Sequence, residues 1–326
     1  MQRVLVIINN PTQASYRLRI EALIEPLALS GFELVVRVRP RGWLARRKLL
    51  RSAGEYAQVV LQRKLLDPSD ARLLGRHARR VLFDVDDAVM RHDGPAGWVS
   101  RWRTRRRFLA TARSLDHVVA GNELLAGLFA ERGCATSIIP TVVDPADYVV
   151  KKHAPTDAPT LVWIGSKSTL SYLRDVEPAL AQASVHVPGL RLLTIADRTL
   201  EPCAIPLEHV TWSKQTEAMA LLRGDIGIAP TPHTPWTEGK CGFKIVQYMA
   251  CGLPVIASPV GANARIVRAG ETGFSPASVD EWPALIERLC KDVTLRQSMG
   301  RAGRERVEAT YSITAAVQRW VEVLSA

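Results

Sequence analysis

The chain has 326 residues, a formal net charge of +11 and 47% hydrophobic residues, which favours about two domains with buried cores. No apolar run approaches the roughly 20 residues of a membrane-spanning helix, so no transmembrane segment is expected. The five cysteines are odd in number and contain no C-x-x-C pair, which indicates a reduced, cytoplasmic chain without a cysteine metal site.

The first half alternates short apolar runs with longer amphipathic stretches. Strands are predicted at residues 3–8, 33–38, 57–62, 80–85, 117–120 and 136–140, and helices at 15–29, 99–113 and 122–131. This alternation indicates a parallel sheet with helices on both faces. Arg17 and Arg19 start the first helix, where they either are solvated or reach an acceptor phosphate. Asn122 either caps the last helix or binds a ligand.

Positive charge is concentrated in two segments of this half. Residues 37–51 hold seven basic residues and no acidic one, and residues 101–107 hold five basic residues. A solvated face, a surface for anionic lipid headgroups and a nucleic-acid site all stay open, although no nucleic-acid motif accompanies the charge. Because Trp43, Trp98 and Trp102 are interleaved with the arginines, we expect docking on an anionic membrane surface and no nucleic-acid partner.

An acidic cluster, FDVDDAV, contains Asp84, Asp86 and Asp87 at the end of a predicted strand. The carboxylates either form caps and salt bridges or act on a substrate. In the second case Asp86 or Asp87 orients an acceptor hydroxyl or accepts its proton. A paired-carboxylate glycosidase and a D-x-D-D metal site stay open as alternatives.

Residues 142–160, rich in Pro, Asp and Lys, are typical of a linker. After it, strands are predicted at 160–165, 190–196, 208–212, 225–230 and 254–258, and helices at 169–184, 214–222, 242–251, 279–290, 294–309 and 313–325. The predicted fold class is α/β, with two doubly wound parallel-sheet domains and a cleft between them. The predicted division is an N-terminal domain at 1–145, a linker at 146–159, a C-terminal domain at 160–310 and a final helix at 311–326 that packs back toward the first domain.

Two stretches of the second half have the character of phosphate sites. In EGKCGFKIVQYMACGLPVIASPVG, residues 238–261, Lys240 and Lys244 flank the start of a predicted helix, where cations are unfavourable unless an anion is bound. Gly242 allows close approach to the backbone, so this stretch predicts a diphosphate site. In WIGSKSTLSYL, Gly165, Ser166, Lys167 and Ser168 lie between a strand and a helix, where α/β proteins bind ligands. Neither a P-loop nor a G-x-G-x-x-G dinucleotide motif is present.

The second half resembles the retaining glycosyltransferases of family 4, which have the GT-B fold. The resemblance rests on PTPHTPWTEGKCGFKIVQYMACGLPVIASPVGANARIV..GETGF, residues 230–274, together with WIGSKSTLSYL, HVTWS and DIGIAP in the family's order. The first half is similar through FDVDDAV, VVAGNELLA and IIPTVVD. In this family the C-terminal domain holds a nucleotide-sugar donor, the N-terminal domain holds the acceptor, and metal is usually not required.

The resemblance therefore implies a cytoplasmic enzyme that moves a sugar from a UDP- or GDP-linked donor to a glycan or lipid-linked acceptor, without a cofactor. Fixed cations at the leaving diphosphate would stabilise the transition state. The residues assigned to catalysis are Asp86, Asp87, Lys240 and Lys244. Those assigned to the donor are Gly165, Ser166, Lys167, Trp212, Gly242, Phe243 and Gln247, and those assigned to the acceptor are Arg17, Arg19 and Asn122.

Both glutamate positions of the family pattern E-x7-E are occupied by other residues. Gln247 stands at the second glutamate, Gly239 stands at the first, and Glu238 is one residue out of register. An amide side chain still donates and accepts hydrogen bonds, so Gln247 can bind ribose hydroxyls. The missing carboxylate motivates an alternative function, a non-catalytic protein of the same fold that binds a nucleotide sugar or a glycan.

Overall fold

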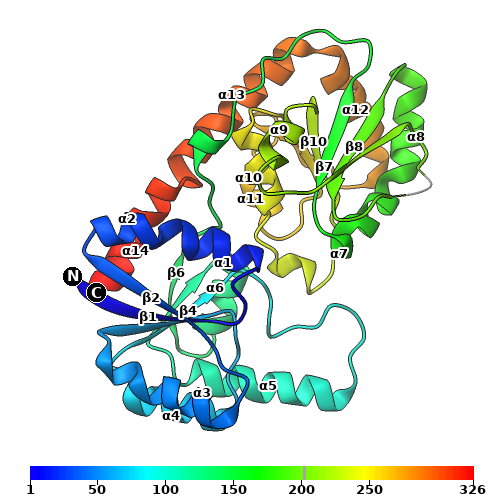
Figure 1. Cartoon of the computed structure of the whole chain (residues 1–326). Helices are drawn as coiled ribbons and strands as arrows, with labels where there is room; N and C mark the ends of the chain where they lie inside the picture. The colour runs from blue at the N-terminus through cyan, green and yellow to red at the C-terminus, as the bar shows by residue number, and fades with distance from the viewer. Residues whose placement is uncertain (201–202) are drawn as a thin grey trace. The chain divides into compact units, whose positions relative to one another are not determined.

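The computed structural model describes residues 1–200 and 203–326, which form two compact units (Figure 1). The N-terminal unit contains residues 1–142, 238–241 and 313–326. The C-terminal unit contains the other described residues between 143 and 312. The chain therefore leaves the C-terminal unit for four residues, Glu238–Cys241, and finally returns to the N-terminal unit with its last helix.

The N-terminal unit is built on six parallel strands in the order β2-β1-β3-β4-β5-β6. The central strands β1, β3, β4 and β5 contain β-branched and other apolar residues that are buried on both sides of the sheet, as expected for parallel strands covered by helices. Their bounds are β1 (Gln2–Ile8), β2 (Phe32–Val38), β3 (Gln58–Gln62), β4 (Val81–Val85), β5 (His117–Ala120) and β6 (Ala135–Ile138).

Helices cover both faces of this sheet (Figure 1). One face carries α1 (Ala14–Arg19), the 3-10 turn η1 (Glu21–Leu23), α2 (Ile24–Leu29) and α14 (Ile313–Ser325), whose apolar side chains share one core with the strands. The other face carries α3 (Trp43–Arg51), α4 (Pro68–His77), α5 (Trp98–Ala112) and α6 (Glu123–Ala130). The helix predicted at 15–29 is thus divided, because the backbone leaves the helical region at Ile20 (φ −123°).

The C-terminal unit is built on a second sheet of six parallel strands, in the order β12-β11-β10-β7-β8-β9. The order reverses beside β7, so β7 and β10 flank the switch point where ligands bind in doubly wound sheets. The bounds are β7 (Thr160–Ile164), β8 (Arg191–Ala196), β9 (Leu207–Thr211), β10 (Ile226–Ala229), β11 (Val255–Ala257) and β12 (Gly273–Phe274).

Two cores lie on the two faces of this sheet. The first packs α8 (Glu177–His186) and α12 (Trp282–Lys291) against the strands, and the second packs α9 (Glu217–Leu221), α10 (Phe243–Ala250), α11 (Asn263–Ile266) and α13 (Val293–Thr310). The helix predicted at 169–184 is divided into α7 (Lys167–Leu170), η4 (Ser171–Val176) and α8. The remaining short turns are η2 (Ser52–Glu55), η3 (Pro145–Asp147), η5 (Thr237–Gly239) and η6 (Val279–Glu281).

Candidate active site

The loop after β7 presents polar groups at the carboxyl end of the strand. Gly165 packs so closely on Trp163 that a Cβ would lie 2.6 Å from the ring atom Cη2, which explains the glycine. Ser166, Lys167 and Ser168 are exposed, and the two serine hydroxyls lie 2.8 Å apart. The backbone N–H of Lys167 donates to the Asp197 carboxylate at 2.7 Å, which fixes the start of α7. The predicted phosphate loop is therefore a short, exposed strand-to-helix turn.

Lys244 lies close to this loop through a shared partner. Its ammonium nitrogen is 4.2 Å from the centroid of the Trp163 ring, the same ring that packs against Gly165. Trp163 is fully buried and Lys244 is half-buried. A cation over an indole face is stabilised by about 0.5–2 kcal/mol, so the ring holds Lys244 in place. The structure thus brings together Lys244 and the 165–168 loop, which lie far apart in the sequence.

Gly242 precedes α10 with a left-handed backbone, φ +63° and ψ +24°. A Cβ there would lie 2.5 Å from Ile266 Cδ1 and 3.0 Å from Asn263 Oδ1, in the neighbouring helix α11. Both the backbone and the packing therefore require glycine, independently of any ligand. Phe243, the next residue, is half-buried against the core under α10.

Two other predicted donor residues have protein partners. Gln247 is 3% exposed, and its amide nitrogen donates to the Tyr148 hydroxyl at 3.2 Å. Trp212 is 37% exposed, and its indole N–H donates to Glu217 at 2.6 Å. Gln247 thus lies in the interior of the C-terminal unit, whereas Trp212 lies at its surface.

In the N-terminal unit the acidic cluster is divided. Asp84, inside β4, is fully buried and forms an ion pair with Arg19 at 2.6 Å. The remaining donors of Arg19 bind the Ile139 carbonyl and the Thr141 hydroxyl. Burial opposes the charged guanidinium, but the Asp84 carboxylate outweighs it and raises the pKa of Arg19. Because Arg19 is buried and bound to Asp84, its position does not support the predicted acceptor-binding role.

Asp86 and Asp87 follow β4 at the carboxyl edge of the sheet and share a cation. Arg63, the residue after β3, binds Asp87 at 2.6 Å, and its Nε lies 3.6 Å from Asp86. Arg63 also donates to the Ser15 hydroxyl at 3.2 Å. Its φ of +55° is the sole left-handed non-glycine backbone among the described residues. Such strain is typical of functional sites.

Lys240 belongs to the same cluster, because Glu238–Cys241 packs on the N-terminal unit. Burial raises the pKa of the Asp87 carboxyl, while the charges of Lys240 and then of Arg63 act in the opposite direction. The cluster therefore combines a partly desolvated carboxylate with two cations, as an acid–base or hydroxyl-orienting group requires.

Asn122 holds the segment that carries Lys240. Its side-chain oxygen accepts from Leu125 N–H and caps α6, while its amide nitrogen donates to the carbonyls of Gly239 and Lys240 at 3.1 and 3.2 Å. Asn122 is 3% exposed. The helix cap expected from the sequence is present, and the amide also positions Lys240. Arg17, in contrast to Arg19, is half-buried.

Two residues of these sites were not identified from the sequence. Arg63 could have been identified, because it is a charged residue directly after a buried strand, at the carboxyl edge of the sheet where α/β proteins bind ligands. Trp163 lies within a strand and has no such signal. Lys240 and Lys244, predicted to face one point, belong to different units by their contacts.

Neither a metal centre nor a membrane span is found in residues 1–200 and 203–326. No group of three or more His, Cys, Asp or Glu side chains is placed to hold an ion there. No helix of this part of the chain combines the length and hydropathy needed to cross a bilayer.

Comparison with known proteins places these sites in context. Residues 158–292 match the family described as glycosyl transferases group 1. The chain is 23% identical over 237 residues to the glycogen synthase of Mycobacterium tuberculosis, covering 66% of this chain and 56% of that protein. It is 25% identical over 113 residues to the D-inositol 3-phosphate glycosyltransferase of Paenarthrobacter aurescens, covering 34% and 24% of the two chains. The chain thus spans about half the length or less of these curated relatives.

Two solved structures match along essentially the whole chain. HepE of Anabaena, solved in complex with UDP and glucose, has a TM-score of 0.72 at 15% identity and is covered completely. Sucrose-phosphate synthase of Thermosynechococcus elongatus has a TM-score of 0.74 at 16% identity and is covered to 98%. Together with the two sheets of six parallel strands, these matches show the GT-B fold, which confirms the predicted fold class.

Proposed function

We propose that this protein is a glycosyltransferase of the EC 2.4 class, because residues 158–292 match the family of glycosyl transferases of group 1 and the chain has the GT-B fold. It moves a sugar from a nucleoside-diphosphate donor to a hydroxyl of a glycan or lipid-linked acceptor, with retention of configuration. We further propose that it acts in the cytoplasm, in cell-surface polysaccharide or glycolipid synthesis.

One observation carries this proposal. The Lys244 ammonium and the exposed 165–168 loop meet at the Trp163 ring, at the carboxyl end of β7. A fixed cation beside a turn that opens a helix provides two features of a diphosphate site. The neighbours support a UDP-linked donor, because HepE was solved with UDP-glucose.

In this mechanism the cations act on the leaving group. As the bond from the anomeric carbon to the donor oxygen breaks, negative charge grows on the diphosphate, and Lys244 and Lys167 stabilise it. The Trp163 ring keeps Lys244 from relaxing away, so the stabilisation is built in before the reaction. We assign donor contacts also to Gly165, Ser166 and Ser168.

The carboxylate cluster of the N-terminal unit is assigned to the acceptor. Asp87 orients the attacking hydroxyl and takes its proton, and Asp86 shares the cation of Arg63. Burial raises the pKa of Asp87, and the charges of Lys240 and Arg63 act against that rise. We propose that Arg63 positions this pair, because its left-handed backbone places one guanidinium beside both carboxylates.

The experiment is calorimetric binding of UDP and GDP to the whole chain and to Lys244→Ala. Loss of a charge-assisted hydrogen bond costs about 1.5–3 kcal/mol, which weakens binding roughly 10- to 150-fold. Lys214→Ala, at an exposed lysine of the same unit, serves as the control and should bind normally. Equal diphosphate affinity in Lys244→Ala and the wild type would contradict the assigned site.

A second candidate function is a binding protein without turnover. Gln247 stands where the family has a carboxylate, and its amide is already engaged by Tyr148 in the interior. Release of UDP from UDP-sugars, assayed with and without acceptor mixtures, separates the two functions. Tight UDP binding with no turnover of any donor would favour the binding protein.

A further inference from the structure

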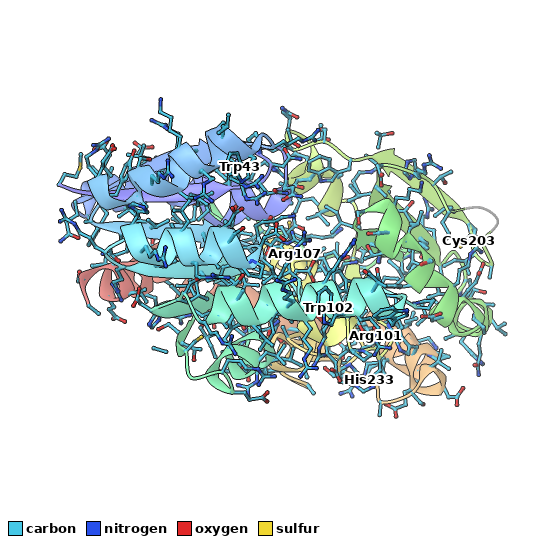
Figure 2. The ribbon with its side chains drawn as sticks, turned by 90° about the horizontal axis from the view of Figure 1, so that it is seen from below. Trp43, Arg101, Trp102, Arg107, Cys203 and His233 are labelled. Atoms are coloured by element: carbon cyan, nitrogen blue, oxygen red, sulfur yellow. The ribbon has the colours of Figure 1, made fainter. Side chains whose placement is uncertain are left out.

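The helical layer formed by α3, α4 and α5 carries most of the exposed tryptophans of the chain. Trp43 of α3 is 58% exposed, and Trp98 and Trp102 of α5 are 79% and 53% exposed. The neighbouring Leu44 is 73% exposed. A soluble surface seldom carries several large apolar side chains on adjacent helices without a partner. Figure 2 shows Trp43 on α3 and Arg101, Trp102 and Arg107 on α5 on the side of the N-terminal unit turned toward the viewer.

The first two turns of α5 are exposed around the whole helix. Residues 97–103 are all exposed, and burial begins only at Phe108. A helix normally buries one stripe of its surface, so these turns extend beyond the packed layer. Trp98 and Trp102 are four residues apart and therefore lie on one side of α5.

Many cations of this layer are not used by the fold. Arg39 and Arg46 pair with the buried Asp70, and Arg107 pairs with Asp67, so these three stabilise the structure. The other cations of α3 and α5 form no ion pair among residues 1–200 and 203–326. They are Arg47, Lys48 and Arg51 of α3 and Arg101, Arg103, Arg105 and Arg106 of α5.

Cations and indole rings are also coupled on both helices. The Arg47 guanidinium lies 5.2 Å from the Trp43 ring centroid, and the Arg106 guanidinium lies 5.3 Å from that of Trp102. Each pair places a positive charge beside an amphipathic ring, which suits the headgroup region of a bilayer, where tryptophan and cations are both stabilised.

We propose that this surface, formed by the exposed faces of α3 and α5, docks on an anionic lipid bilayer. Charge selects acidic headgroups, and Trp43, Leu44, Trp98 and Trp102 insert at the interface. A nucleic acid would also bind the positive charges, but its binding would not require Leu44 and three tryptophans exposed on the helix surfaces. Docking is independent of the proposed function, because it needs neither donor nor acceptor, and it would bring a lipid-linked acceptor to the protein.

Sedimentation of the full chain with vesicles tests the inference. Neutral phosphatidylcholine vesicles are compared with vesicles that contain 30% phosphatidylglycerol, at low and at moderate salt. We expect binding to the anionic vesicles only, weakened by salt as surface charges are screened. Binding to both kinds equally, or to neither, would overturn the proposal.

Variants assign the binding to this surface. One variant combines Arg101→Gln, Arg103→Gln, Arg105→Gln and Arg106→Gln, all at exposed positions. Each basic residue near an anionic surface contributes roughly a fivefold change in partitioning, so four removals should lower it on the order of several hundredfold. The control combines Lys152→Gln, Arg191→Gln, Lys214→Gln and Arg301→Gln, at exposed positions of the C-terminal unit, and should retain wild-type partitioning. Equal losses in both variants would show unspecific charge attraction and contradict the assignment.

A second pair of measurements separates insertion from charge and from nucleic acid. The charge-neutral variant Trp98→Ala/Trp102→Ala should bind anionic vesicles at least tenfold more weakly, and its thermal stability and UDP affinity should not change. Partitioning like that of the wild type would contradict insertion at α5. Anisotropy titrations with labelled single-stranded RNA and duplex DNA complete the test. Tighter binding to either polymer than to anionic vesicles at equal ionic strength would contradict the proposal and indicate that the partner is a nucleic acid.

Discussion

At the residue scale, the acidic cluster shows how neighbouring side chains acquire different roles. Asp84 lies within β4 and points into the core, where it is fully buried beside Arg19. Asp86 and Asp87 come after the last residue of the strand and are partly exposed. The spacing therefore distinguishes a core residue from residues of the sheet edge. The sequence allowed both salt-bridging and substrate roles for the cluster. It could not assign them, because the ion pairs with Arg19 and Arg63 join residues that are far apart in the chain.

We predict that Arg19→Met strongly destabilises the N-terminal unit. The substitution leaves the Asp84 carboxylate buried without a partner, which typically costs about 3–5 kcal/mol. Urea unfolding measures the loss of free energy. The double variant Arg19→Met/Asp84→Leu removes both charges and should recover most of that loss. No difference in stability between the single and double variants would contradict a coupled pair.

A second prediction concerns the pH dependence of turnover. Burial raises the pKa of Asp87, so the acid limb of kcat/KM should lie above the ordinary aspartate value of about 3.9. The cation of Lys240 lowers this pKa, and therefore Lys240→Met should raise it further and move the limb to higher pH.

The matched control for this shift is Lys240→Arg, which keeps the positive charge and should leave the limb in place. A profile of Lys240→Met that coincides with the wild type, or that moves to lower pH, would exclude Asp87 as the titrating group. The same profiles in Asp87→Asn should lose the acid limb together with most of the turnover.

At the element scale, hydrophobic periodicity predicted most strands and the long C-terminal helices. The strands at 3–8 and 117–120 and the helices near 294–309 and 313–325 closely match β1, β5, α13 and α14. Helices α3 and α4 were not predicted, because α3 is dominated by basic residues and Pro68 opens α4. The predicted helices at 15–29 and 169–184 are each divided by a 3-10 turn. The apolar residues keep a helical spacing through these turns, so their periodicity did not predict the division.

We predict that Gly242→Ala weakens both folding and donor binding. The left-handed backbone and the approach to Ile266 make any Cβ strained, at a cost of about 1–3 kcal/mol. The strain lies at the start of α10, two residues before Lys244, so UDP affinity should fall as well. Thermal unfolding and calorimetry measure the two effects.

Gly127→Ala is the matched control for this prediction. Gly127 lies inside α6, and a Cβ there meets nothing within 4 Å. The substitution should therefore stabilise the protein by about 0.5–1 kcal/mol. Opposite signs at the two glycines are expected. Similar effects of both substitutions would show that strain at Gly242 is unimportant.

At the scale of the whole molecule, one sequence motif serves two units. The stretch EGKCGFK passes from Glu238–Cys241 of the N-terminal unit to Gly242 and Lys244 of the C-terminal unit. The sequence showed two lysines four residues apart and a helix start, which was sufficient to predict an anion site. It could not show that Lys240 interacts with Asp87 and that Lys244 lies on Trp163, because these contacts span long stretches of chain.

We predict that turnover needs no added divalent metal. In many phosphate-transfer sites a metal neutralises the leaving diphosphate, and here the fixed charges of Lys244 and Lys167 are assigned to that task. Activity measured in excess EDTA should equal activity in magnesium or manganese, while Lys244→Ala should lose activity under both conditions. If EDTA abolishes turnover and manganese restores it, the lysines do not suffice. Asp86, Asp87 and Asp197, the carboxylates beside the two sites, would then be tested as ligands by the metal affinity of their Asn variants.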